Sequence, residues 1–221
     1  MGLVLTIGNQ NYSSWSLRPW LALEHTGAPY ESIVIPLYRA DSPGRISARS
    51  PSGRVPVLDH DGLVIWDSLA ICEYLAEAFP DAHLWPSDRA ARAHARSVSA
   101  EMHSSFSALR TNMGMNIRAR LPGYGRTPDS LRDIERVRAI WTGCRSRFGA
   151  GGPYLFDAFS IADAMFAPVV LRFRTYAVEL DAVARAYSDA MLERPALKKW
   201  IQAAEAEDII IDQFEYPPIR A

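Results

Sequence analysis

The first eighty residues alternate short apolar runs with stretches of helical periodicity. Four apolar runs predict strands, at residues 3–7, 32–35, 55–58 and 63–66. The last two runs flank His60-Asp61-Gly62, whose Asp-Gly pair is typical of a hairpin turn. Residues 20–25 and 67–79 place apolar side chains at the spacing of a helix. This order predicts an α/β domain in which a mixed four-stranded sheet carries helices on its faces.

Strand signals end near Pro80, and the remainder of the chain is helical in pattern. We expect helices at roughly 88–120, 129–148, 160–176, 178–192 and 195–206. Long apolar helices with short connections are typical of a helical bundle. We interpret residues 81–86, which are framed by prolines, as a linker. The sequence thus predicts two domains, residues 1–80 and an all-α bundle at residues 87–221.

Composition then narrows the function classes. The chain has 221 residues, with 24 Lys and Arg against 25 Asp and Glu, a net charge of −1. It therefore lacks the basic field of a sequence-independent nucleic-acid binder. No apolar run reaches the roughly 18 residues of a membrane span, and we expect no signal peptide. Since Cys72 and Cys144 are too few for a disulfide framework, we expect a reduced, cytoplasmic protein without nucleic-acid or membrane partners.

A serine-rich segment joins the first strand to the first helix, at Asn11-Tyr12-Ser13-Ser14-Trp15-Ser16-Leu17-Arg18-Pro19-Trp20. Any of its serines could simply cap the helix. Because Pro19 has no N–H, it fits best within the first helical turn. We therefore expect Ser16 to be the N-cap, with Pro19 at the third helical position. This choice leaves Ser13 and Ser14 in the loop, free to face a ligand near the positive end of the helix dipole.

The segment Gly53-Arg54-Val55-Pro56 opens the third predicted strand. A proline at a strand start belongs on an edge or beside a bend, because it cannot donate to the ladder. A cis bond before Pro56 would turn the backbone of Val55 outward, where it could pair with an extended peptide-like ligand. The alternative is an ordinary trans proline on an edge strand.

Trp66-Asp67-Ser68 precedes a helical run and forms an N-cap signal. The free N–H groups of a helix N-terminus bind carboxylates, and the Ser68 hydroxyl would add a donor. The Asp67 carboxylate could accept from an ammonium group. Together these groups match the two charges of a free amino-acid end, although plain capping explains the motif equally well.

Ser160 and Asp163 are spaced as a capping box before an apolar helix. Here we favour a structural role, the capping of the helix.

The remaining candidates for a functional site are weaker. The five histidines show no metal-ligand spacing, so we expect no metal. Cys72 is expected to be a buried, inert thiol. We expect a solvated helix face to carry Arg110, Arg118 and Arg120.

In this order and at these spacings, the four motifs resemble the cytosolic glutathione S-transferase superfamily over nearly the whole chain. The serine segment is similar to the zeta-class motif. The resemblance implies a thioredoxin-like first domain, glutathione as co-substrate, a homodimer, and a hydrogen bond from Ser13 or Ser14 to the glutathione sulfur. It also implies roles for Arg54 at the glycyl carboxylate, for Val55 with Pro56 at the cysteinyl backbone, and for Asp67 with Ser68 at the γ-glutamyl end.

The segment departs from the zeta motif at two places. Trp15 stands where that motif carries a cysteine, and Pro19-Trp20 replaces its usual continuation. These departures weigh against maleylacetoacetate isomerase activity. We therefore expect a glutathione transferase active in detoxification. An isomerase of that type and a non-catalytic interaction module of the same fold remain as alternatives.

The implied reaction is attack of a glutathione thiolate on a small electrophile. We expect Ser13 to donate to the sulfur, with Ser14 second. An electrophile pocket would lie between the domains. The residues that could line it are Met102, Phe106, Met113, Met115, Arg172 and Arg174. Core packing explains the methionines at least as well, and both arginines could be ordinary surface charges.

Overall fold

The computed structural model of the chain describes residues 2–215. Its sheet has the strand order β2-β1-β3-β4. The strands are β1 (Leu3–Ile7), β2 (Tyr30–Val34), β3 (Val57–His60) and β4 (Leu63–Trp66). β1 pairs in parallel with β2 and antiparallel with β3, which pairs antiparallel with β4. The predicted mixed sheet is confirmed.

The hairpin between β3 and β4 turns at the predicted Asp-Gly pair. Asp61 and Gly62 both have positive φ, at 54° and 90°, as a tight turn between antiparallel strands requires. The Gly62 N–H also donates to Asp59 Oδ1 at 2.8 Å. The hairpin brings the end of β4 back to the position from which the next helix starts.

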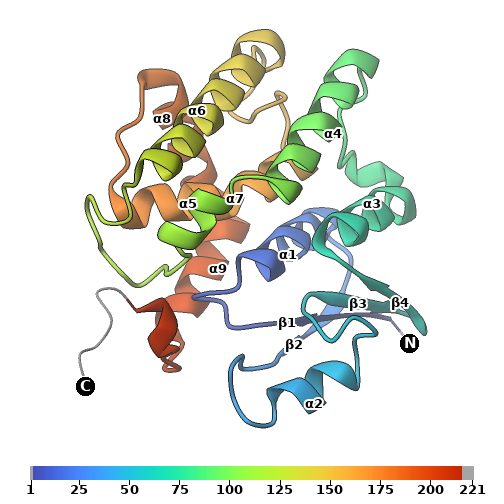
Figure 1. The fold of residues 1–221 in the computed structure, drawn as a ribbon. Coiled ribbons are helices and arrows are strands. Elements are labelled where there is room, and N and C mark those ends of the chain that lie inside the picture. The colour runs from blue at the N-terminus through green and yellow to red at the C-terminus, as the bar shows by residue number, and fades with distance from the viewer. Residues whose placement is uncertain (1, 216–221) are drawn as a thin grey trace.

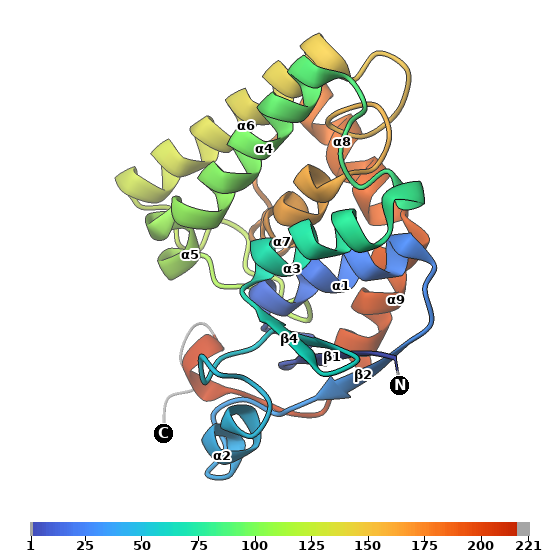
Figure 2. The ribbon, with the colours of Figure 1, turned by 90° about the vertical axis from the view of Figure 1, so that its right-hand side faces the viewer.

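Helices lie on both sides of the sheet. On one side, α1 (Ser14–Thr26) packs beside α3 (Ser68–Ala78), and the short α2 (Ser42–Ser47) lies on the opposite side (Figures 1 and 2). α1 and α3 begin where the chain leaves β1 and β4, so their N-termini belong to the same end of the domain. A single turn of 3₁₀ helix, Pro80–Ala82, follows α3.

The second half of the described chain is helical. It contains α4 (Arg89–Ser104), α5 (Ser107–Asn112), α6 (Pro128–Phe148), α7 (Ile161–Tyr176), α8 (Ala182–Glu193), α9 (Pro195–Ala206) and a short 3₁₀ turn (Asp212–Phe214). α7 runs through the centre of this part (Figure 1), and nearly all of its residues are buried. None of the described helices combines the length and apolar character needed to cross a bilayer.

One continuous apolar core joins the two halves. α1 contacts α7 and α9 as well as α3, so it is shared between the sheet and the helical part. Trp20 on α1 meets Trp200 on α9 edge-on, with ring centroids 5.0 Å apart. Burying such large aromatic surfaces fixes the helical part against the first helix. Every group carried by α1 therefore has a defined position relative to both halves.

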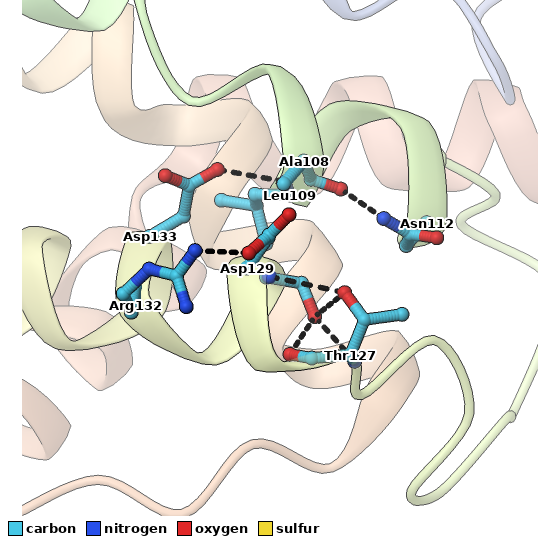
Figure 3. A network of polar contacts seen from close by, with 8 residues as sticks. Ala108, Leu109, Asn112, Thr127, Asp129, Arg132 and Asp133 are labelled. Carbon is cyan, nitrogen blue, oxygen red and sulfur yellow. Dashed lines mark hydrogen bonds and ion pairs between the residues drawn. The ribbon is translucent and has the colours of Figure 1, made fainter.

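The helix predicted over 88–120 is wrong in its extent. The chain leaves α4 at Ser104, passes through Phe106 with φ of 63°, and forms the short α5. α5 has no cap from its own N-cap side chain. Its Leu109 N–H instead donates to Asp133 Oδ2 of α6 at 2.9 Å (Figure 3). The break depends on a partner 24 residues away, which local periodicity could not reveal.

The capping box predicted at Ser160 and Asp163 is present at the start of α7. Asp163 Oδ2 accepts from the Ser160 N–H at 2.8 Å and from its hydroxyl at 3.0 Å, and Oδ1 accepts from the Leu155 N–H at 3.0 Å. Asp163 is completely buried. Burial raises the pKa of its carboxyl to about 6, against the lowering effect of these hydrogen bonds.

Candidate functional site

A cavity of about 560 Å³ lies where the N-terminus of α3, the start of β3 and the end of α4 meet. It is lined by Trp15, Ser52, Arg54, Val55, Pro56, Trp66, Asp67, Ser68 and His103. We call it the Val55–Asp67 cavity. All five residues expected to bind the tripeptide backbone and its ends are in this set. The bond between Val55 and Pro56 is cis, as the peptide-pairing hypothesis required.

Asp67 starts α3 from a backbone conformation with φ of 75°. Its Oδ1 accepts from the N–H groups of Leu69 and Ala70 at 2.9 and 3.2 Å, so it is the N-cap that the sequence predicted. Its Oδ2 lies 3.2 Å from His103 Nε2. The neighbouring Ser68 hydroxyl is buried without a partner. A buried, unsatisfied hydroxyl at a helix N-terminus is ready for an anionic ligand.

His103 is a cavity residue that sequence reasoning missed. It comes from α4, in the second half of the chain, and contacts the Trp15 ring edge-on with centroids 5.4 Å apart. Burial lowers the pKa of its imidazole, and the positive charges of Arg18 and Arg110 lower it further, while Asp67 opposes them. A lone histidine on a helix carries no sequence signal of these contacts, because Asp67 and Trp15 are both more than thirty residues away.

The serine segment differs from the expected arrangement. Ser13, not Ser16, is the N-cap of α1. The Ser13 hydroxyl donates to Ser16 Oγ at 2.7 Å, and Ser16 Oγ also accepts from the Gly8 N–H at 3.0 Å. Ser16 is therefore buried inside the helix to satisfy the end of β1. Pro19 consequently lies beyond the first helical turn, a position that removes one helical hydrogen bond.

Ser14 is the first residue of α1 and is 9% exposed. Its Oγ accepts a hydrogen bond from Arg172 Nη2 of α7 at 3.3 Å. Neither Ser13 nor Ser14 is among the residues that line the cavity, whereas the next residue, Trp15, is. The two serines thus directly precede a residue of the cavity lining, and Ser14 contacts the helical half through Arg172.

Three arginines gather around this junction. Arg18 is 1% exposed, and its Nε and Nη1 have no hydrogen-bond partner. The guanidinium carbons of Arg18 and Arg110 lie 4.4 and 4.8 Å from the centroid of the Trp15 ring. Burial lowers the pKa of Arg18, and the charges of Arg110 and Arg172 lower it further. Such a positive, desolvated cluster favours a bound anion.

The expected solvated face of arginines is wrong for Arg110 and Arg118, whereas Arg120 is exposed as expected. Arg110 donates to the main-chain oxygens of Met102 and His103, while stacking on Trp15. Arg118 donates to Tyr12 Oη at 2.9 Å and to main-chain oxygens near the C-terminus. Long basic side chains are usually solvated. The guanidinium groups of Arg110 and Arg118 instead donate to carbonyl or hydroxyl oxygens of other segments.

The residues expected around the electrophile lie elsewhere. Met102, Phe106 and Met113 are at most 5% exposed and belong to the hydrophobic core, which was the alternative interpretation. Arg174 is at the surface, 3.7 Å from Glu205. Of the two arginines expected near the electrophile, Arg172 is the buried one. Cys72 is also buried, and burial raises the pKa of its thiol, which makes it inert.

A C-terminal strap, residues 207–215, lies against the loop that carries the serines. The Glu207 carboxylate accepts from Asn9 Nδ2 at 2.7 Å and from the Asn11 N–H at 3.0 Å. Tyr12 Oη donates to Glu215 Oε1 at 2.5 Å. Figure 1 shows this red segment beside the blue turn between β1 and α1. The strap therefore holds the approach to α1 in place.

Comparison with known proteins agrees with this geometry. Residues 12–78 match the glutathione S-transferase N-terminal domain, and residues 93–203 match the C-terminal domain. The chain belongs to the cytosolic glutathione S-transferase superfamily, as a zeta-like enzyme. The predicted family and fold are confirmed.

Two relatives and one solved structure illustrate the similarity. A probable maleylacetoacetate isomerase from Caenorhabditis elegans is 38% identical over 96 residues, spanning 43% of this chain and only 44% of that protein. The maleylacetoacetate isomerase of Pseudomonas aeruginosa is 30% identical over 201 residues, covering 85% of this chain and 91% of the relative. A glutathione transferase homologue from Burkholderia, solved with bound glutathione, shares the fold with a TM-score of 0.69 at 23% identity, covering 93% of this chain and 99% of that one.

Proposed function

We propose that the chain binds glutathione in the Val55–Asp67 cavity and ionises its thiol for attack on a small electrophile. The observation that carries this proposal is the convergence of Arg54, Val55 and Ser68 on one cavity beside a buried cationic cluster. Ser68 is 13 residues from Val55 in the sequence, and the chemistry of these residues matches the three parts of a γ-glutamyl tripeptide. A homodimer and a cytoplasmic location, implied by the family resemblance, are part of the proposal.

Each end of the tripeptide has a complementary group. The N-terminus of α3 and the unpartnered Ser68 hydroxyl suit the γ-glutamyl carboxylate, and the Asp67 carboxylate suits the ammonium. The Val55 backbone suits the cysteinyl peptide groups, as an added strand would. Arg54 suits the glycyl carboxylate through paired charge-assisted hydrogen bonds.

Ser14 is the preferred donor to the sulfur. The Ser13 proton is directed to Ser16, whereas Ser14 only accepts in its bond with Arg172. A free thiol has a pKa of about 8.5, and lowering it by two units requires about 2.7 kcal/mol in favour of the thiolate. One hydrogen bond to a charged group contributes about 1.5–3 kcal/mol and a helix N-terminus about 0.3–1 kcal/mol. Ser14 and α1 therefore suffice, and the Arg18 charge adds to them.

The decisive experiment separates binding from thiol ionisation. Calorimetric titration with glutathione measures binding, and the ultraviolet absorbance of the bound thiolate against pH measures ionisation. Ser68→Ala should weaken binding about 10-fold or more, because it removes a donor to a charged group. Ser97→Ala, an exposed serine on α4, is the matched control. A wild-type chain that binds no glutathione would refute the proposal and favour the interaction module.

Ser13 and Ser14 are expected to differ in their effect on the pKa of the bound thiol. Ser13→Ala should reduce the free energy of unfolding by about 0.5–2 kcal/mol through loss of the cap, with little change in the bound thiol pKa. Ser14→Ala should raise the pKa of the bound thiol, and it should also cost about 1–3 kcal/mol of stability because it leaves Arg172 Nη2 without this acceptor. Denaturant unfolding and the thiolate titration measure the two effects. The reverse pattern would make Ser13 the sulfur ligand.

A maleylacetoacetate isomerase is the second candidate. The full-length similarity to the Pseudomonas enzyme favours it, whereas Trp15 in place of the zeta-class cysteine does not. The two activities differ in product, because an isomerase returns glutathione unchanged. Incubation with maleylacetoacetate and with an aryl halide, followed by product analysis, distinguishes them.

A further inference from the structure

Arg172 occupies an unusual place for an arginine. It lies inside α7, a helix whose other residues are nearly all buried, and is itself 4% exposed. Its Nε donates to the Met113 carbonyl at 2.8 Å and its Nη2 donates to Ser14 Oγ at 3.3 Å. Within residues 2–215, its guanidinium forms no ion pair with a carboxylate. Burying such a cation is costly, and an apolar side chain would pack there more cheaply.

The direction of the bond to Ser14 has a chemical consequence. A guanidinium has donors only, so Ser14 Oγ can take part in this bond only as an acceptor. Its own proton is therefore left for another acceptor. Ser13 differs, because its proton is engaged by Ser16 Oγ. The bond from Arg172 thus distinguishes two adjacent serines that look equivalent in the sequence.

We propose that Arg172 is a positioning residue that acts through Ser14. Its donated hydrogen bond fixes the Ser14 oxygen so that the hydroxyl proton is available to the glutathione sulfur. A hydroxyl that accepts from a cation is also a stronger donor. This inference rests on the proposed function, and it makes the ionisation of a thiol bound by the first half of the chain depend on a residue of the second half.

The surroundings disfavour this charge but do not remove it. Among the described residues, Arg110 of α5 and Arg18 of α1 are cations within electrostatic reach of Arg172, and Tyr176 of α7 is a further titratable group beside it. Tyr176 Oη donates to the Gly114 carbonyl at 2.9 Å. Burial and Arg110 lower the pKa of Arg172 to about 10. The guanidinium therefore stays charged throughout the range in which a bound thiol would titrate.

The test replaces the Arg172 guanidinium and measures the pKa of the bound glutathione thiol. In Arg172→Met, the pKa of the bound glutathione thiol should rise by about one unit, from about 6.5 to about 7.5, so that the thiolate fraction at pH 7 falls about threefold. Binding of S-methylglutathione, which has no thiol, should change less than about twofold. Arg172→Met in the Ser14→Ala background should add nothing, because Arg172 then has no Ser14 oxygen through which to act.

Matched variants keep the test decisive. Arg185→Met removes an exposed arginine on α8 and should leave the thiol titration unchanged. Arg172→Lys retains the charge with less of the directed geometry and should give an intermediate shift. It also serves if the methionine variant does not fold. An unchanged thiol pKa in Arg172→Met, or full additivity with Ser14→Ala, would overturn the inference while leaving glutathione binding itself intact.

Discussion

At the scale of single residues, buried polar groups in and beside the Val55–Asp67 cavity have no hydrogen-bond partner within the protein. Arg18 is buried under Trp15 with two nitrogens unpartnered, and the Ser68 hydroxyl is unpartnered at the N-terminus of α3. Natural proteins tolerate such unfavourable groups mainly where function requires them. A bound anion would offset both costs at once. Replacing Arg18, the cation among these groups, tests this explanation.

Arg18→Met should leave the ligand-free protein equally stable or more stable by up to about 2 kcal/mol, because an apolar side chain replaces an unpaired buried cation. The same change should raise the pKa of the bound glutathione thiol. Urea denaturation and the thiolate titration test the two halves. Arg185→Met should change stability by no more than about 0.5 kcal/mol, as is usual for surface substitutions. Clear destabilisation by Arg18→Met would mean that this arginine serves packing.

At the scale of elements, the sequence predicted turns and caps formed by neighbouring residues. It did not predict helix boundaries that depend on hydrogen bonds to distant residues. The Asp-Gly turn, the Asp67 cap and the Ser160–Asp163 box each lie within a few residues, and the structure has all of them. The start of α1 and the break before α5 were mispredicted. They depend on the bond from Gly8 to Ser16 and on that from Leu109 to Asp133, neither of which periodicity can reveal.

The capping box of α7 makes stability depend on pH with a definite sign. The folded-state pKa of Asp163 is raised to about 6 from 3.8, so the folded protein holds this proton more tightly than the unfolded chain. Its contribution is fully present below the unfolded pKa and is lost as pH rises through 6. Asp163→Asn should be destabilised at every pH, since the Leu155 and Ser160 donors lose a carboxylate.

The gap between wild type and Asp163→Asn should narrow by about 2 kcal/mol between about pH 4.5 and about pH 7.5, because the variant cannot titrate at this position. Denaturant unfolding of both proteins across this range measures it. Ser160→Ala is the companion variant, which keeps the titrating carboxyl and should retain the pH dependence. A gap that widens with pH would show that the carboxyl is held ionised in the folded state.

At the scale of the whole molecule, the site is assembled from segments far apart in the sequence. The first half of the chain supplies the cavity floor, α4 supplies His103, and α7 supplies the bond to Ser14. The last described residues then lie against the turn between β1 and α1 (Figure 1). Sequence motifs could nominate the residues that we propose to bind the tripeptide, because each of them belongs to a short local motif in the first half. The contributions of the second half have no local pattern, since each is defined only by what it touches.

The C-terminal strap provides the test at this scale. Glu207 satisfies the Asn11 N–H and the Asn9 side chain, just before the serines. Glu207→Ala leaves both donors without this acceptor and should cost about 1–3 kcal/mol of stability. Since Ser14 directly follows this loop, hydrogen exchange at residues 9–14 should accelerate and the bound thiol pKa should rise. Asp208→Ala, an exposed neighbour, should change neither. If exchange accelerates while the thiol pKa is unchanged, the strap supports the fold but has no part in positioning the sulfur ligand.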